Sequence, residues 1–160
     1  MKFLKQFSEV LLLGLSLCVA ADRGPVAPFQ ANEKIAFFGD SITHGGIYLY
    51  ELQLFEALRH PYAPVRILNS GISGGSAWSG LQRIDFDLLE RNPDRVFVMF
   101  GMNDVGRGNY LPGTPDEKTL AARSRSLDSY RRNLAAVVDR LTQAGKKVVL
   151  ITPSPYDQYG

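Results

Sequence analysis

The sequence predicts an α/β protein in which helices cover both faces of a parallel β-sheet. Short apolar runs alternate along the chain with segments whose apolar residues recur every three or four positions. One run, Val96–Phe100, is apolar throughout, as in strands buried on both faces. Strand–helix alternation of this kind favours right-handed crossovers and a single layered sheet. The 160 residues, 45% of them hydrophobic, provide for one domain.

The first 21 residues are predicted to be a secretory signal that does not belong to the fold. Lys2 and Lys5 precede the apolar run Val10–Val19, which Ala20-Ala21 follow. This order of charged, apolar and small residues is typical of a cleaved signal, and the run is short for a membrane span. A retained anchor is the alternative. We therefore expect a secreted or periplasmic protein.

Cysteine content and charge exclude several classes of protein. Cys18, the only cysteine, lies in the predicted signal, so no disulfide or thiol nucleophile is expected in the mature chain. A lipoprotein signal needs a small residue before the cysteine, and Leu17 is not small. The formal net charge of +2, without a basic run, makes nucleic acid an unexpected partner.

The first half of the domain contains two predicted strands and one helix after an irregular lead-in at residues 22–33. Residues 34–38 and 65–68 are short apolar strands, and residues 47–58 form the helix. The predicted buried face of this helix consists of Ile47, Tyr50, Leu54 and Leu58. The predicted domain runs from residue 34 to residue 160.

The second half repeats the alternation. A helix marked by Leu81, Ile84 and Leu88 is stopped by Asn92-Pro93, and the strand Val96–Phe100 follows. After a loop at residues 106–115, apolar residues spaced from Leu127 to Leu141 predict a long helix that ends at Gly145. Residues 147–152 are the fourth predicted strand.

Small and polar residues follow the first three strands. They are Gly39-Asp40-Ser41, the segment Asn69–Gly74, and the segment Gly101–Asp104. In parallel α/β sheets, ligands bind outside the carboxyl ends of the strands, so these three turns are expected to line one crevice.

The three turns contain the parts of an oxyanion hole. Ser41 lies at a strand-to-helix turn, so its N–H points out near a helix N-terminus, where negative charge is stabilised. Gly74 can bring its N–H close to a ligand oxygen, and Asn103 offers a side-chain amide. Each residue also has a purely structural interpretation: a serine can cap a helix, a glycine can permit a turn, and Asn103-Asp104 can form a side-chain-bonded turn.

The same residues resemble the SGNH (GDSL) hydrolases. Gly39-Asp40-Ser41-Ile42-Thr43 is similar to the first family block, Asn69–Gly74 to the second, and Gly101-x-Asn103-Asp104 to the third. The resemblance covers residues 34–152. It implies a flavodoxin-like three-layer sandwich and metal-free hydrolysis of acyl esters without a cofactor, with acetylated sugars, lipids and simple esters among the substrates.

The resemblance also assigns roles to residues. It implies Ser41 as nucleophile and oxyanion donor, with Gly74 and Asn103 as the other two donors. The supporting residues of these turns are Asp40, Asn69 and Asp104.

The family's fourth element, Asp-x-x-His, is absent from the sequence. Ser41 stands three residues before His44, and Ala57 stands three residues before His60. We expect His44 to line the pocket mouth or cap a helix and His60 to lie at the surface. The expected explanation is that the 160 residues are a fragment that stops before a last strand and helix. The alternative is an inert relative that binds glycans without cleaving them.

The leading hypothesis is an exported serine esterase that removes acyl groups, chiefly acetyl, from carbohydrate. Trp78 is a candidate sugar-stacking platform, and the alternative is a partly buried packing residue. A nucleotide-binding domain ranks last, because Gly71–Gly75 has neither the Gly-x-Gly-x-x-Gly fingerprint nor a Walker lysine. The oligomeric state is left open.

Overall fold

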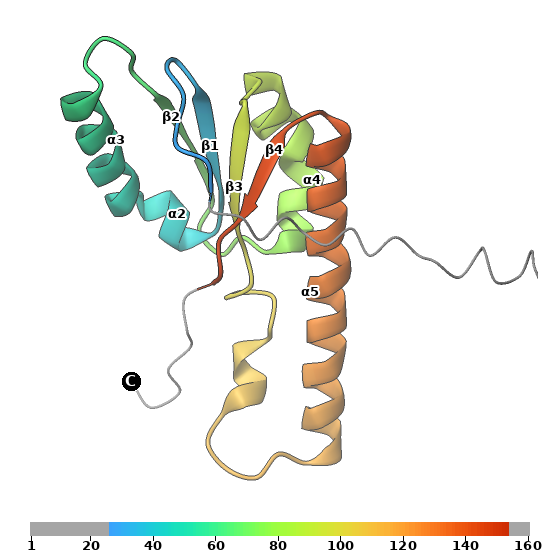
Figure 1. Cartoon of the computed structure of the whole chain (residues 1–160). Helices are drawn as coiled ribbons and strands as arrows, with labels where there is room; N and C mark the ends of the chain where they lie inside the picture. Colours follow the sequence, from blue (N-terminus) through green and yellow to red (C-terminus); the bar gives the residue numbers. More distant parts are fainter. Residues whose placement is uncertain (1–25, 154–160) are drawn as a thin grey trace, which may run out of the picture.

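A computed structural model of the protein describes residues 26–153, so the predicted signal at residues 1–21 lies outside the described part. The core is a parallel four-stranded sheet, and helices cover both of its faces (Figure 1), which confirms the predicted α/β class. The strands lie in the order β2 (Arg66–Gly71), β1 (Lys34–Gly39), β3 (Arg95–Met99) and β4 (Lys147–Leu150).

The strand register aligns the carboxyl ends of the first three strands. Gly39 at the end of β1 pairs with Gly71 of β2 on one side and with Met99 of β3 on the other. The turns that follow β1, β2 and β3 therefore leave the sheet at the same edge, as the sequence predicts. This alignment brings the three polar segments to one place.

On one face of the sheet, α4 (Ala77–Asp87) and α5 (Glu117–Gln143) enclose the larger core cluster. Phe38 and Phe100 meet edge to face at its centre, 5.2 Å between ring centroids. The prediction of the long helix is confirmed, but α5 begins ten residues before Leu127. Asp116 caps this earlier start by accepting a hydrogen bond from the Thr119 N–H.

On the other face, α3 (Ile47–Arg59) packs through a different side than the sequence predicts. Leu49 is buried, and Tyr48 and Leu52 pack beside it. The predicted inward residues are instead exposed by 73%, 70%, 62% and 75%: Ile47, Tyr50, Leu54 and Leu58. The helix carries apolar residues on two opposite sides, and either side could face the sheet. The sequence analysis predicted the wrong side.

The remaining elements differ from the prediction mainly at their ends. A short helix, α2 (Ser41–Gly45), precedes α3, and two 3₁₀ turns form at Leu89–Arg91 and Arg107–Tyr110. The φ angle of Gly145 is +74°, which confirms the predicted stop of α5. Within residues 26–153, none of the helices combines the length and the apolar character needed to cross a membrane.

The described part of the lead-in, from residue 26, is fastened to the sheet by a buried ion pair. The Arg95 Nε donates to Glu33 Oε1 over 2.8 Å, and both side chains are almost fully buried. The same guanidinium donates to the carbonyls of Ala27 and Pro28. The Phe29 ring packs edge to face on Phe97, so the irregular segment covers apolar surface of the sheet.

Candidate active site

The turn after β1 presents a serine at the start of a helix. Asp40 caps α2, because its Oδ1 accepts a hydrogen bond from the Ile42 N–H over 3.0 Å. The Asp40 side chain is almost fully buried, whereas Ser41, the first residue of α2, is exposed. The cap therefore holds the Ser41 backbone within the first turn of the helix while its side chain faces solvent.

The end of β2 is bonded to α2 through one asparagine. Asn69 Nδ2 donates to the carbonyl oxygens of Thr43 and His44, over 2.8 and 3.3 Å, and its Oδ1 accepts from the Gly71 N–H. The two Nδ2 hydrogen bonds join β2 to α2, and the Oδ1 hydrogen bond lies within the end of β2. Asn69 supports the turn that carries Ser41.

His44 is held in the same junction. Its Nδ1 lies 3.1 Å from the Gly71 carbonyl oxygen. A carbonyl can only accept, so this hydrogen bond requires Nδ1 to carry the proton, which leaves Nε2 as the basic nitrogen of the neutral ring. Among residues 26–153 no hydrogen bond joins the His44 ring to Ser41.

The loop after β2 crosses the end of β1. The Ile72 N–H donates to the Gly39 carbonyl over 3.1 Å, and the Gly75 N–H donates to the Ile72 carbonyl. A Cβ added to Gly75 would lie 3.5 Å from the Asp40 Cα, so the two backbones run against each other. Gly74 has a φ of +76° and open space where a side chain would stand.

The turn after β3 is joined to that loop. Asn103 Nδ2 donates to the Gly75 carbonyl over 2.8 Å. An asparagine amide has two N–H groups, and this is the one hydrogen bond of the Asn103 side chain found among the described residues. The amide therefore lies beside the residue that follows Gly74, with a second N–H group not used in that contact.

Asp104 links the same turn to α4. Its Oδ1 accepts from the Ala77 N–H over 2.9 Å at the start of that helix. Its Oδ2 is buried without a hydrogen-bond partner within residues 26–153. Burial raises the pKa of the Asp104 carboxyl, the hydrogen bonds from the Ala77 and Gly101 backbone oppose this shift, and the negative charge of Asp40 adds to it.

The three turns are thus connected by hydrogen bonds around the end of β1. An exposed serine, the open face of a glycine and a side-chain amide thus come from three different strand ends that meet at one edge of the sheet. Trp78 lies on the first turn of α4 and is 59% exposed.

The sequence analysis missed two buried polar residues behind these turns. Thr43 is fully buried, and its hydroxyl contacts the Tyr48 hydroxyl at 3.2 Å. Arg83 is 7% exposed and bonds to the ends of β1 and β2. A detectable signal existed for Arg83, because it lies three residues after Gly80 and beside Ile84 on the inward stripe of α4.

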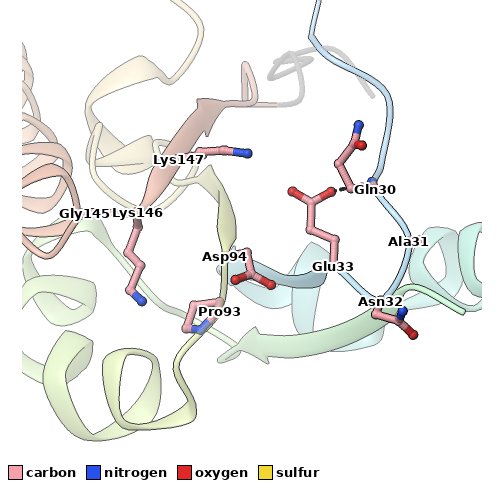
Figure 2. Close-up of a pocket in the computed structure, with 9 residues that line it drawn as sticks. All are labelled: Gln30, Ala31, Asn32, Glu33, Pro93, Asp94, Gly145, Lys146 and Lys147. Carbon is pink, nitrogen blue, oxygen red and sulfur yellow. Dashed lines mark hydrogen bonds between the residues drawn. The ribbon is translucent and has the colours of Figure 1, made fainter. Parts of the chain in front are cut away.

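A cavity of about 390 Å³ lies at the opposite, amino-terminal edge of the sheet (Figure 2). Both of its carboxylates already have partners: Glu33 binds Arg95 and the Gln30 N–H, and Asp94 accepts from the Lys34 N–H. No cluster of three potential metal-binding side chains is found between residues 26 and 153. The connected turns, which lie at the other end of the strands, form the better candidate site.

The sequence model of the GDSL-like Lipase/Acylhydrolase family matches residues 37–160. Among curated relatives, an acetylxylan esterase from Geobacillus stearothermophilus is 30% identical over 139 residues, which cover 77% of this chain. The chain spans 60% of the length of that relative.

Solved structures agree with this match. A gut microbial diltiazem-metabolizing enzyme superposes with a TM-score of 0.74 at 30% identity, over 82% of this chain and 29% of that one. A catalytic mutant of an acetylxylan esterase from Geobacillus stearothermophilus superposes with a TM-score of 0.62 at 26% identity. That match covers 79% of this chain and 62% of the mutant.

Proposed function

Because the chain belongs to the GDSL-like lipase/acylhydrolase family, we propose that its domain hydrolyses carboxylic esters with Ser41 as the nucleophile. The observation that carries the proposal is the hydrogen bond from Asn103 to the Gly75 carbonyl. It joins the third turn to the loop that lies against Asp40, which supports a common site for the Asn103 amide, the Gly74 N–H and Ser41.

In the proposed reaction, the Ser41 Oγ attacks the ester carbonyl carbon as a base accepts the hydroxyl proton. The carbonyl oxygen becomes an oxyanion, which accepts hydrogen bonds from the N–H groups of Ser41 and Gly74 and from the Asn103 amide. The C–O bond to the alcohol then breaks, and the alcohol leaves with a proton. Water attacks the acyl-serine, which releases the carboxylic acid and restores the hydroxyl.

Asp40 and Asp104 have supporting roles in this proposal. Each carboxylate accepts the backbone N–H of a helix start, at Ile42 and at Ala77, and thereby fixes the turn in front of that helix. Neither carboxylate has to touch the substrate for this purpose. Asn69 supports the first turn differently: its Nδ2 donates to the Thr43 carbonyl of α2, and its Oδ1 accepts from the Gly71 N–H of β2.

The proposed substrates are acetyl esters on carbohydrate. This finer assignment comes from the relatives named as acetylxylan esterases. The exposed indole of Trp78 is the proposed stacking surface for a sugar ring. Export is proposed from the signal-like order of residues 1–21.

The test compares hydrolysis of p-nitrophenyl acetate by wild-type protein and by Ser41→Ala, both expressed from the complete reading frame. We expect the variant to lose at least about a thousandfold in kcat/KM, as other enzymes do when the nucleophile is removed. The matched control is Ser124→Ala, which removes an exposed hydroxyl on α5 and should change nothing. Wild-type rates in Ser41→Ala contradict the proposal.

Two further arms separate the alternatives. Residues 1–160 expressed alone should show almost no Ser41-dependent turnover, because neither His44 nor His60 has the Asp-x-x-His spacing. Rapid turnover that Ser41→Ala abolishes would instead assign the role of base to His44. Binding of an acetylated xylooligosaccharide without hydrolysis by the complete protein would favour a glycan-binding relative.

A further inference from the structure

Arg83 is the one charged side chain on the buried face of α4, which otherwise consists of Ala77, Gly80 and Ile84. Its guanidinium lies over the Phe38 ring, 4.4 Å from the centroid, and pairs with Asp87 one turn later. Burial lowers the pKa of the Arg83 guanidinium, which the charge of Asp87 opposes. A guanidinium nevertheless remains charged in proteins, so a cation is held inside the sheet–helix interface.

The hydrogen bonds of this cation reach two strand ends. Arg83 Nη2 donates to the carbonyl of Gly39 over 3.2 Å and to the carbonyl of Ser70 over 2.9 Å. Gly39 is the last residue of β1, immediately before Asp40 and Ser41, and Ser70 is the second-last residue of β2. One nitrogen therefore bridges the ends of two paired strands.

The Gly39 carbonyl is also the acceptor that holds the loop of Gly74. It receives the Ile72 N–H over 3.1 Å in addition to the Arg83 donor. An apolar side chain at position 83 could fill the same space without the desolvation cost of a buried charge. Only a donor of suitable reach can tie the two carbonyls together, and the planar guanidinium supplies it.

We propose that Arg83 is a positioning residue for the oxyanion site. From its place between α4 and the sheet, its guanidinium bridges the Gly39 and Ser70 carbonyls. This bridge sets the spacing between the Ser41 turn and the Gly74 loop. Arg83 does not touch the substrate. The proposal rests on the proposed esterase function, but the bridging of the two strand ends by Arg83 can be tested separately.

The experiment uses Arg83→Met and Arg83→Lys in the protein expressed from the complete reading frame. Methionine keeps the apolar stem, and lysine keeps the charge but loses the planar fork. In both, we expect kcat to fall about 10- to 100-fold with KM within about threefold of wild type, because misplaced oxyanion donors affect the transition state more than binding. The matched control is Arg140→Met, which removes an ion pair to Asp85 of α4 and touches neither strand end.

A second readout is amide hydrogen exchange. The Ile72 N–H, bonded to Gly39, should exchange about tenfold faster in Arg83→Met than in wild type. The reference is the Arg66 N–H, which donates to the Glu33 carbonyl at the far end of the same strand pair and should change little.

The outcomes are distinct. If the Tm falls, both amides exchange faster to the same extent and kcat per folded molecule is unchanged, Arg83 is a stabilising residue only and the proposal is overturned. If wild type shows no Ser41-dependent turnover, the proposed function fails, and the exchange ratio of Ile72 to Arg66 still decides whether Arg83 holds the junction. An unchanged ratio overturns that role as well.

Discussion

The closest backbone approach in the candidate site is made at Gly71, and a single methyl group there tests how tightly α2 is seated. A Cβ on Gly71 would lie 2.2 Å from the His44 backbone nitrogen and 2.5 Å from the Thr43 carbonyl carbon. Both atoms belong to the backbone of α2, so no side chain can rotate away. To lengthen the shortest contact to about 3.2 Å, α2 has to move by about 1 Å. Even that distance is shorter than the optimal separation of non-bonded atoms.

For Gly71→Ala we therefore expect a loss of about 1–3 kcal/mol in the free energy of unfolding, the usual range for overpacking. Because Ser41 moves with α2, ester hydrolysis should fall by as much as about 100-fold. The matched control is Gly45→Ala at the last residue of α2, where an added Cβ meets nothing within 4 Å. This variant should be neutral or slightly stabilising in urea unfolding. Equal stability of both variants and wild type would refute the described seating of α2.

Two further predictions concern buried charge. Glu33→Ala leaves Arg95 buried without its carboxylate, so the free energy of unfolding in urea should fall by about 3–5 kcal/mol. In contrast, Asp128→Ala, which breaks the exposed pair with Arg131, should lower the free energy of unfolding by less than about 1 kcal/mol. Equal losses in the two variants would contradict the expected difference between a buried and an exposed ion pair. The raised pKa of Asp104 means that the folded state holds a proton longer than the unfolded state, so this group's contribution to stability falls as pH rises from about 4 through the raised pKa. The Tm of Asp104→Asn should rise relative to that of wild type across this pH window and not below it. A Tm difference that is the same at all pH values would contradict a raised pKa of the buried Asp104 carboxyl.

The fold and the meeting of the three polar turns could be predicted because both depend on short-range signals. Continuous apolar runs such as Val96–Phe100 mark strands buried on both faces. Polar residues after such runs gather at one sheet edge because parallel strands share a direction, which is why the turns after β1, β2 and β3 meet. The residues that form each strand end could thus be predicted from the neighbouring sequence alone.

Other features depend on packing that the local pattern does not specify. The face of α3 was predicted wrongly because Leu49 and Leu52 compete with Ile47 and Leu54 for the inward side, and the rotation is set by contact with the sheet. The early start of α5 follows from its cap at Asp116, which lies outside the apolar spacing. No spacing rule would have predicted that a buried guanidinium binds two strand-end carbonyls.

The most direct test of the central claim is the effect of Asn103→Ala on kcat for p-nitrophenyl acetate, measured in the protein expressed from its complete reading frame. If the amide beside Gly75 is an oxyanion donor, kcat should fall about 10²- to 10³-fold while KM stays within about threefold. Wild-type kcat in Asn103→Ala, alongside an inactive Ser41→Ala, would show that the third turn supplies no donor and would contradict the account.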